Sequence, residues 1–255
     1  MARDWNEAQT KERDFWKNIY VEKVNDIESY TPITKEAAIG FSRKTLNRHQ
    51  LDFRDLSGKV IADIGCGPYG IILGIDVQSE DSFEVKPTLI GVDPLMDFYV
   101  SDIGLLKSKD NIQLHNAQGE SIPVENSSCD YVFCVNVIDH VQNPEQCVAE
   151  LYRITKSGGM CGVSLHITTP LFSPFSSILK YVDANHPHHF TFRKADNLLS
   201  KHFDKVAVSY MATMLDDQPD FAPKNIFKLS NKVRAIKRWS STFILRSAYF
   251  NCRKD

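Results

Sequence analysis

The sequence has little that points to a membrane, a secreted scaffold or a metal site. No apolar run approaches the ~18 residues of a membrane span. The beginning, MARDWNEAQTKERDFWKN, is dense in charge and lacks the apolar core of a signal peptide. The six cysteines include no C-x-x-C pair, and five of them fall inside expected strands or helices. We therefore expect buried, reduced thiols and, by default, a cytoplasmic protein.

An excess of one charge is also lacking. The 30 basic and 32 acidic side chains give a net charge of −2, so no overall field points to nucleic acid or an anionic membrane. No internal repeat of roughly 20–50 residues is visible. The composition that remains, 42% hydrophobic and 24% charged, is typical of a globular protein, and 255 residues allow one large α/β domain.

Strands and helices are expected to alternate along this chain. Apolar segments predict seven strands, at residues 60–64, 88–93, 112–116, 129–138, 160–167, 205–211 and 241–252. Helices are expected within the first 55 residues, one of them capped by Thr34, and again near 194–203. The clearest helix is capped by Asn143, has Pro144 in its first turn, and is expected to end at Gly158–Gly159. The alternation predicts an α/β fold with a doubly wound, mostly parallel sheet.

The segment IADIGCGPYG contains a G-x-G-x-x-G turn, formed by Gly65, Gly67 and Gly70. By itself this spacing suggests a dinucleotide such as NAD or FAD. Asp63, just before the turn, argues against a dinucleotide, because a buried acid needs a partner that a pyrophosphate cannot supply. S-adenosylmethionine carries a sulfonium and an ammonium but no phosphate, and its charge suits an acid at this position.

Four segments resemble, in order and spacing, the motifs of the class I S-adenosylmethionine-dependent methyltransferases that act on small molecules. They are VIADIGCGPYG, LIGVDP, QGESIPVENSSCDYVFCVNVIDHVQNP and AELYRITKSGGMCGVS, and together they cover roughly residues 55 to 170. Three positions depart from the family pattern. One extra residue precedes Gly70, Gln118 stands where an aspartate is usual, and Ser157 replaces a proline.

The resemblance implies S-adenosylmethionine as cofactor, S-adenosylhomocysteine as product, and a set of binding residues. Asp93 would accept both ribose hydroxyls, and the first two glycines of the turn would let the backbone approach the methionine part. The full predicted set is Asp63, Gly65, Cys66, Gly67, Gly70, Asp93, Pro94, Leu95, Gln118, Gly119 and Asn136. The structural alternatives are a tight turn for the glycines, a helix cap for Asp93 and a strand-end turn for Asn136.

Methyl transfer needs a base only if the acceptor must lose a proton. The candidates follow expected strand ends, where α/β folds bind ligands. They are His140, His189, Asp139 and His188, with His166 and His186 in the same part of the chain. His140 and His189 are favoured, against the alternative that they only order loops. No acidic cluster accompanies the histidines, so a metal is not expected.

We expect a single domain with three parts: a helical N-terminal extension or lid (1–55), a cofactor-binding core (56–170) and an acceptor side (171–255). The predicted activity is methylation of O, N or C of a small metabolite. Residues 221–246 contain no acid and seven basic side chains. This segment suggests an anionic or sugar-type acceptor, or a solvated helix face, ahead of RNA. The alternatives are a flavin or NAD oxidoreductase and a non-catalytic S-adenosylmethionine-binding protein.

Overall fold

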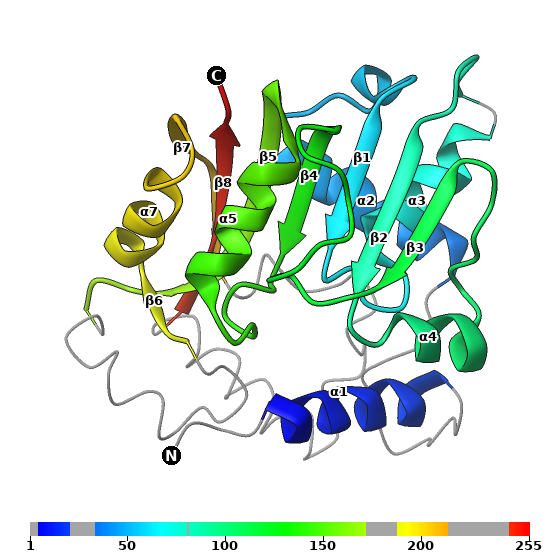
Figure 1. Cartoon of the computed structure of the whole chain (residues 1–255), viewed down its shortest axis with the longest axis horizontal. Helices are drawn as coiled ribbons and strands as arrows, with labels where there is room; N and C mark the ends of the chain where they lie inside the picture. Colours follow the sequence, from blue (N-terminus) through cyan, green and yellow to red (C-terminus); the bar gives the residue numbers. More distant parts are fainter. Residues whose placement is uncertain (1–4, 21–33, 81, 172–187, 214–244) are drawn as a thin grey trace, which may run out of the picture.

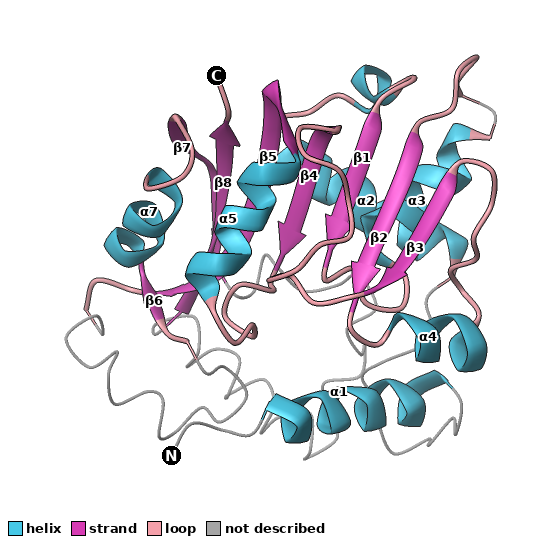
Figure 2. Cartoon of the chain, in the orientation of Figure 1, coloured by secondary structure: helices cyan, strands magenta, loops and turns pink. Residues whose placement is uncertain are grey.

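The computed structural model describes residues 5–20, 34–80, 82–171, 188–213 and 245–255, and these form one sheet with helices on both faces (Figures 1 and 2). The strands are β1 (Val60–Ile64), β2 (Thr88–Asp93), β3 (Ile112–Asn116), β4 (Cys129–Val135), β5 (Thr155–Thr168), β6 (Phe190–Thr191), β7 (Lys205–Thr213) and β8 (Leu245–Arg253).

The strand order is β3-β2-β1-β4-β5-β8-β7, and the two-residue β6 pairs with β5. Neighbours from β3 to β5 run parallel, whereas β8 runs antiparallel to both β5 and β7. The prediction of a doubly wound, mostly parallel sheet is therefore confirmed, with β6 as an addition that was too short to leave a sequence signal.

The helices cover the sheet from both sides and at one edge. They are α1 (Trp5–Tyr20), α2 (Lys35–Arg48), α3 (Gly70–Ser79), α4 (Met96–Phe98), α5 (Pro144–Ile154) and α7 (Phe192–Ser200), with a 3₁₀ turn η1 (Phe53–Leu56) and a π-helical turn η2 (Tyr99–Ile103). Figure 1 shows α5 and α7 in front of the sheet, α2 and α3 behind it, and α1 across its carboxyl edge. Within the described ranges, no helix combines the length and the apolar character needed to cross a membrane.

Local capping signals place the helix starts correctly. The Thr34 hydroxyl accepts the Ala37 N–H at 3.2 Å, and the Asn143 side chain accepts the Gln146 N–H at 3.2 Å. The predicted end of α5 is wrong. The helix stops at Ile154, and the glycine pair lies inside β5. The register between β4 and β5 is irregular there, because Cys129 pairs with Thr155 whereas Tyr131 pairs with Met160.

One further strand prediction needs adjustment. β4 ends at Val135, three residues earlier than expected, whereas β3 coincides with the expected segment IQLHN, Ile112–Asn116. The reason for the early end of β4 is Asn136, whose φ of +56° turns the chain out of the strand direction. His186 and nearly all of the basic segment lie outside the described residues.

Two apolar layers, one on each face of the sheet, form the core. Residues of β1, β2, β4, β5 and β8 pack with α5 and α7 in one layer, and the other layer lies against α2 and α3. All six cysteines are buried and none forms a disulfide, as the sequence predicted. The core thereby fixes the strands whose carboxyl ends carry the candidate site.

Candidate functional site

The predicted cofactor residues gather where β1, β2 and β4 end side by side. Ile64, at the end of β1, pairs with Val92 of β2 and Cys134 of β4. The glycine turn connects β1 to α3, Asp93 is the last residue of β2, and Asn136 directly follows β4. The parallel sheet therefore brings three separate sequence motifs to one edge.

Asp63 obtains its partner from the protein itself. The side chain is only 2% exposed, and its Oδ2 accepts the Ile71 N–H at 2.7 Å, in the first turn of α3. Burial raises the pKa of Asp63 to about 7 against the opposing hydrogen bonds from Ile71 and Ile72. This corrects the sequence argument, in which the cofactor was expected to supply the partner: a helix N-terminus, which favours negative charge, supplies it here.

Glycine is required at the three positions of the turn for different structural reasons, although φ is positive at all three. A Cβ on Gly65 would lie 2.3 Å from Cγ2 of Val137, and one on Gly70 would lie 2.3 Å from Oδ2 of Asp63. A Cβ on Gly67 would have no atom of the described residues within 4 Å apart from its chain neighbours. Gly65 therefore makes room for Val137, and its approach to the cofactor stays a prediction. Gly67 is the position at which a ligand could approach the backbone.

Asp93 fastens the glycine turn to the end of β2. Its Oδ2 accepts the Gly67 N–H at 2.9 Å, and its Oδ1 accepts the Leu95 N–H at 2.9 Å. The side chain is 7% exposed, and burial raises its pKa to about 6 against these two hydrogen bonds. Each carboxylate oxygen can accept more than one hydrogen bond, so this structural role leaves acceptor capacity for a ligand.

Cys66 differs from its neighbours in the turn because it packs inward. Its thiol is buried, and a Cβ on Gly91 in β2 would lie 3.3 Å from its Sγ. Burial raises the pKa of the Cys66 thiol well above its usual value, so the thiol packs as an apolar group. Pro94 and Leu95 follow Asp93 and are half-buried, which leaves part of their surface toward the carboxyl edge.

The predicted adenine segment, Gln118–Gly119, is held against the start of α5. Gln142 Nε2 donates to Gln118 Oε1 at 3.4 Å, and Glu120 Oε1 accepts the backbone N–H groups of Gln142 and Asn143 at 2.7 and 3.0 Å. A Cβ on Gly119 would lie 3.0 Å from the Cys147 sulfur. The half-buried Gln118 amide is thus oriented by a second amide before any ligand contact.

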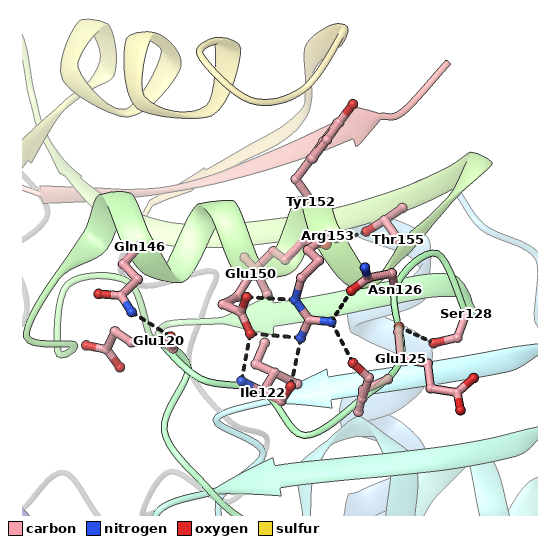
Figure 3. Close-up of polar contacts among 12 residues, drawn as sticks. Glu120, Ile122, Glu125, Asn126, Ser128, Gln146, Glu150, Tyr152, Arg153 and Thr155 are labelled. Atoms are coloured by element: carbon pink, nitrogen blue, oxygen red, sulfur yellow. Dashed lines mark hydrogen bonds and ion pairs between the residues drawn. The ribbon is translucent and has the colours of Figure 1, made fainter.

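Arg153, near the end of α5, holds the rest of this segment and was missed by sequence reasoning. Its guanidinium donates to the carbonyls of Ile122, as Figure 3 shows, and of Val124, each at 2.7 Å. The guanidinium also binds the carboxylate of Glu150, which accepts the Ile122 N–H at 2.8 Å. A basic residue in the last turn of a helix was the available signal, but it does not tell which carbonyls the side chain will bind.

The predicted catalytic residues are brought together only in part. Asp139 is 2% exposed, and one of its oxygens lies 3.9 Å from Nε2 of His140. The backbone N–H of His188 donates to the Asp139 carbonyl at 3.3 Å, and its Nε2 lies 2.9 Å from the Val141 carbonyl. The His188 ring therefore joins two loops, and His189 follows directly.

His166 lies apart from this group, on β5. Its Nδ1 is 3.2 Å from the hydroxyl of Ser247 on β8. Asn136 directly follows β4, and its N–H donates to the Ser164 carbonyl of β5 at 2.9 Å. A positive φ at a non-glycine residue is uncommon and is often found at functional sites, which agrees with the place of Asn136 beside the turn.

Helix α1 contributes residues that the sequence analysis did not assign to the site. It crosses the carboxyl edge of the sheet in Figure 1. The Trp16 ring meets the Tyr69 ring edge-on at 6.1 Å, and the Arg13 guanidinium lies 5.3 Å from the Phe98 ring centre. The apolar spacing of Trp16, Ile19 and Tyr20 predicted this helix, but not the surface it would cover.

Comparison with known proteins agrees with this arrangement. Residues 62–163 match the model of a family described as a methyltransferase domain. The ubiquinone biosynthesis O-methyltransferase of Pseudomonas fluorescens (strain Pf0-1) is 30% identical over 110 residues, which are 41% of this chain and 43% of that protein. The present chain thus matches less than half the length of this curated relative.

Two solved structures share the fold. Geranyl diphosphate C-methyltransferase from Streptomyces coelicolor A3(2) has a TM-score of 0.59 at 14% identity, over 96% of this chain and 97% of that one. Phosphoethanolamine N-methyltransferase 2 from Haemonchus contortus has a TM-score of 0.57 at 18% identity, over 84% of this chain and 52% of that one. Residues 62–163 thus match a methyltransferase domain, and the described part of the chain has the fold of these two methyltransferases.

Proposed function

We propose that the protein binds S-adenosylmethionine and transfers its methyl group to a small molecule. The observation that carries the proposal is the hydrogen bond that Asp63 accepts from the Ile71 N–H at the start of α3. In dinucleotide-binding folds, the pyrophosphate takes the free N–H groups of this helix. Here an internal carboxylate takes them, and a second carboxylate, Asp93, lies at the end of β2. A pyrophosphate would meet two acids, whereas a sulfonium compound would meet favourable charge.

The side chains and backbone groups of this protein would mainly bind and orient the cofactor and the acceptor. Asp93 would accept from the ribose, the backbone at Gly67 would face the methionine part, and Gln118 with Gly119 would flank the adenine. The bound cofactor supplies a methyl group on a sulfonium, which leaves as a neutral thioether when the acceptor's electron pair attacks the methyl carbon. Because the leaving group is already activated, orientation and exclusion of water are the protein's main contributions.

An acceptor that must lose a proton would need a base, and His140 and His189 are the proposed candidates. His140 lies beside the buried Asp139, and His189 adjoins the loop contact made by His188. The acceptor itself is proposed to be small and anionic. The basic side chains of 221–246 support this, as do two solved relatives that were crystallised with phosphomonomethylethanolamine and geranyl diphosphate.

Titration calorimetry with S-adenosylmethionine, S-adenosylhomocysteine and NAD tests the cofactor proposal. We expect binding of the first two and not of NAD. Asp93→Asn should weaken S-adenosylmethionine binding at least about tenfold, because hydrogen bonds to a charged group contribute about 1.5–3 kcal/mol each. Asp97→Asn is the matched control, since Asp97 is exposed in α4, four residues after Asp93. Tight NAD binding without S-adenosylmethionine binding would show that the protein is a dinucleotide-binding protein.

The rate of methyl transfer tests the proposal that His140 or His189 is the base. With an acceptor found by screening for S-adenosylhomocysteine release, His140→Ala or His189→Ala should lower turnover about 10²–10⁴-fold while cofactor affinity stays unchanged. His202→Ala is the control, because His202 is bound to Glu145 on the outer surface of α5. Rates within about threefold of wild type for both variants would remove these histidines from the chemistry.

A further inference from the structure

Helix α1 contacts the carboxyl edge of the sheet, where the predicted cofactor residues lie, at two points. Trp16 packs on Tyr69, which lies in the glycine turn two residues after Gly67. Arg13 stacks on Phe98, which belongs to the segment that follows Asp93. The helix therefore touches both the glycine turn, on the predicted methionine side, and the segment after Asp93, on the predicted ribose side. Figure 1 shows it crossing the carboxyl edge of the sheet.

Glu12 lies on this helix, next to Arg13 and one turn before Trp16. Its Oε1 accepts the indole N–H of Trp16 at 2.7 Å, so the carboxylate is held toward the aromatic contact with the glycine turn. Its negative charge also reaches Asp93 and Tyr99 and contributes to raising the pKa of both. Glu12 thus adds a carboxylate from a different element of the fold, held beside the Trp16 contact with the glycine turn.

In S-adenosylmethionine, the sulfonium joins the ribose to the methionine chain. Asp93 marks the ribose side and Gly67 the methionine side, and Glu12 is supplied by the helix that spans both. We infer, on the basis of the proposed function, that Glu12 is a specificity-determining residue that faces the sulfonium and favours the cationic cofactor over its neutral product. S-adenosylhomocysteine keeps the adenine, the ribose and the amino acid, so only the sulfonium charge and the methyl group distinguish the two ligands.

This role has a consequence for the reaction cycle. When the methyl group leaves, the charge opposite Glu12 disappears, and Glu12 then faces a neutral sulfur. The product should therefore be held less tightly than the substrate. Glu12 is exposed to solvent, so the preference should be modest, roughly two- to fivefold, as for other solvent-accessible charge pairs.

The test is calorimetry of both ligands with wild type and Glu12→Gln. We expect the variant to bind S-adenosylmethionine roughly two- to fivefold more weakly, with S-adenosylhomocysteine binding unchanged. Added salt should reduce the wild-type preference and leave the variant unaffected. Glu7→Gln is the matched control, because Glu7 lies on the same helix and pairs with Lys11. Trp16→Phe, which keeps a ring but removes the N–H donor, should act in the same direction as Glu12→Gln.

The outcomes separate this inference from the proposed function. Equal weakening of both ligands, or none, in Glu12→Gln would overturn the role of Glu12 while the cofactor assignment remains. Failure of the wild-type protein to bind either ligand would overturn the proposed function and this inference with it. Circular dichroism of Glu12→Gln and Glu7→Gln checks that a change in affinity does not come from loss of α1.

Discussion

Gly65 and Gly67 offer a direct test of how the glycine turn is built. Both have a positive φ, +70° and +61°, so alanine at either position should cost about 1–2 kcal/mol of backbone strain. The Cβ of Gly65→Ala would in addition lie 2.3 Å from Cγ2 and 2.8 Å from Cγ1 of Val137. Such an overlap in a packed region costs about 1–3 kcal/mol. Gly65→Ala should therefore lower the free energy of unfolding by about 2–5 kcal/mol, and Gly67→Ala by about 1–2 kcal/mol.

The turn cannot easily move away from this overlap. The Gly65 N–H donates to the Val92 carbonyl at 2.7 Å, which fixes the turn against β2. Val137 is packed against the core layer beneath α5. Relief must therefore come from removing the Val137 methyl groups, and the double variant Gly65→Ala/Val137→Ala should be more stable than the sum of the two single changes predicts.

Urea unfolding of the single and double variants measures this coupling, and calorimetry gives their affinity for S-adenosylmethionine. Gly67→Ala should keep most of its stability but lose cofactor affinity, because its Cβ points to where a ligand could approach the backbone. Equal stability losses at the two positions, or additive effects of Gly65→Ala and Val137→Ala, would refute the assignment of Gly65 to Val137.

Two further predictions concern stability. Arg153→Met should lower the free energy of unfolding, measured with urea, by about 2–3 kcal/mol, because the carbonyls of Ile122 and Val124 lose a charged donor. The control Arg54→Met removes an exposed ion pair and should cost under about 1 kcal/mol. A similar cost for both variants would contradict the role of Arg153. Because burial raises the pKa of Asp63 to about 7 and of Asp93 to about 6, the ligand-free protein should lose stability as pH rises from about 4 to 7, by at most about 1.4 kcal/mol per pH unit per group. Urea midpoints across this range should flatten in Asp63→Asn, and an unchanged slope would argue against a perturbed Asp63.

The sign of the pH effect follows from where the protons are. Between the ordinary pKa of an aspartic acid, 3.8, and the raised value in the folded protein, the unfolded chain has released the proton and the folded chain still holds it. The stabilisation is therefore complete below about 4 and is lost as pH rises through the folded pKa. A bound cationic ligand should oppose this loss by favouring the ionised acids.

The sequence by itself determined the order and type of the elements and the position of the glycine turn. Apolar segments of strand length, a capping Thr34, and Asn143 followed by Pro144 are local signals, and each acts within a few residues of chain. They sufficed for the doubly wound sheet and for the gathering of the glycine turn, Asp93 and Asn136 at one edge. The ligand contacts of these residues stay predictions.

Only the tertiary structure decided which residues meet across elements. It assigned the partner of Asp63 to α3, the space at Gly65 to Val137, the adenine segment to Arg153, and the cover of the carboxyl edge to α1. Each of these contacts except that of Asp63 joins residues far apart in the sequence. Their pairing depends on how the strands and helices stack, and a single side chain carries no signal of the distant group that packing will place beside it.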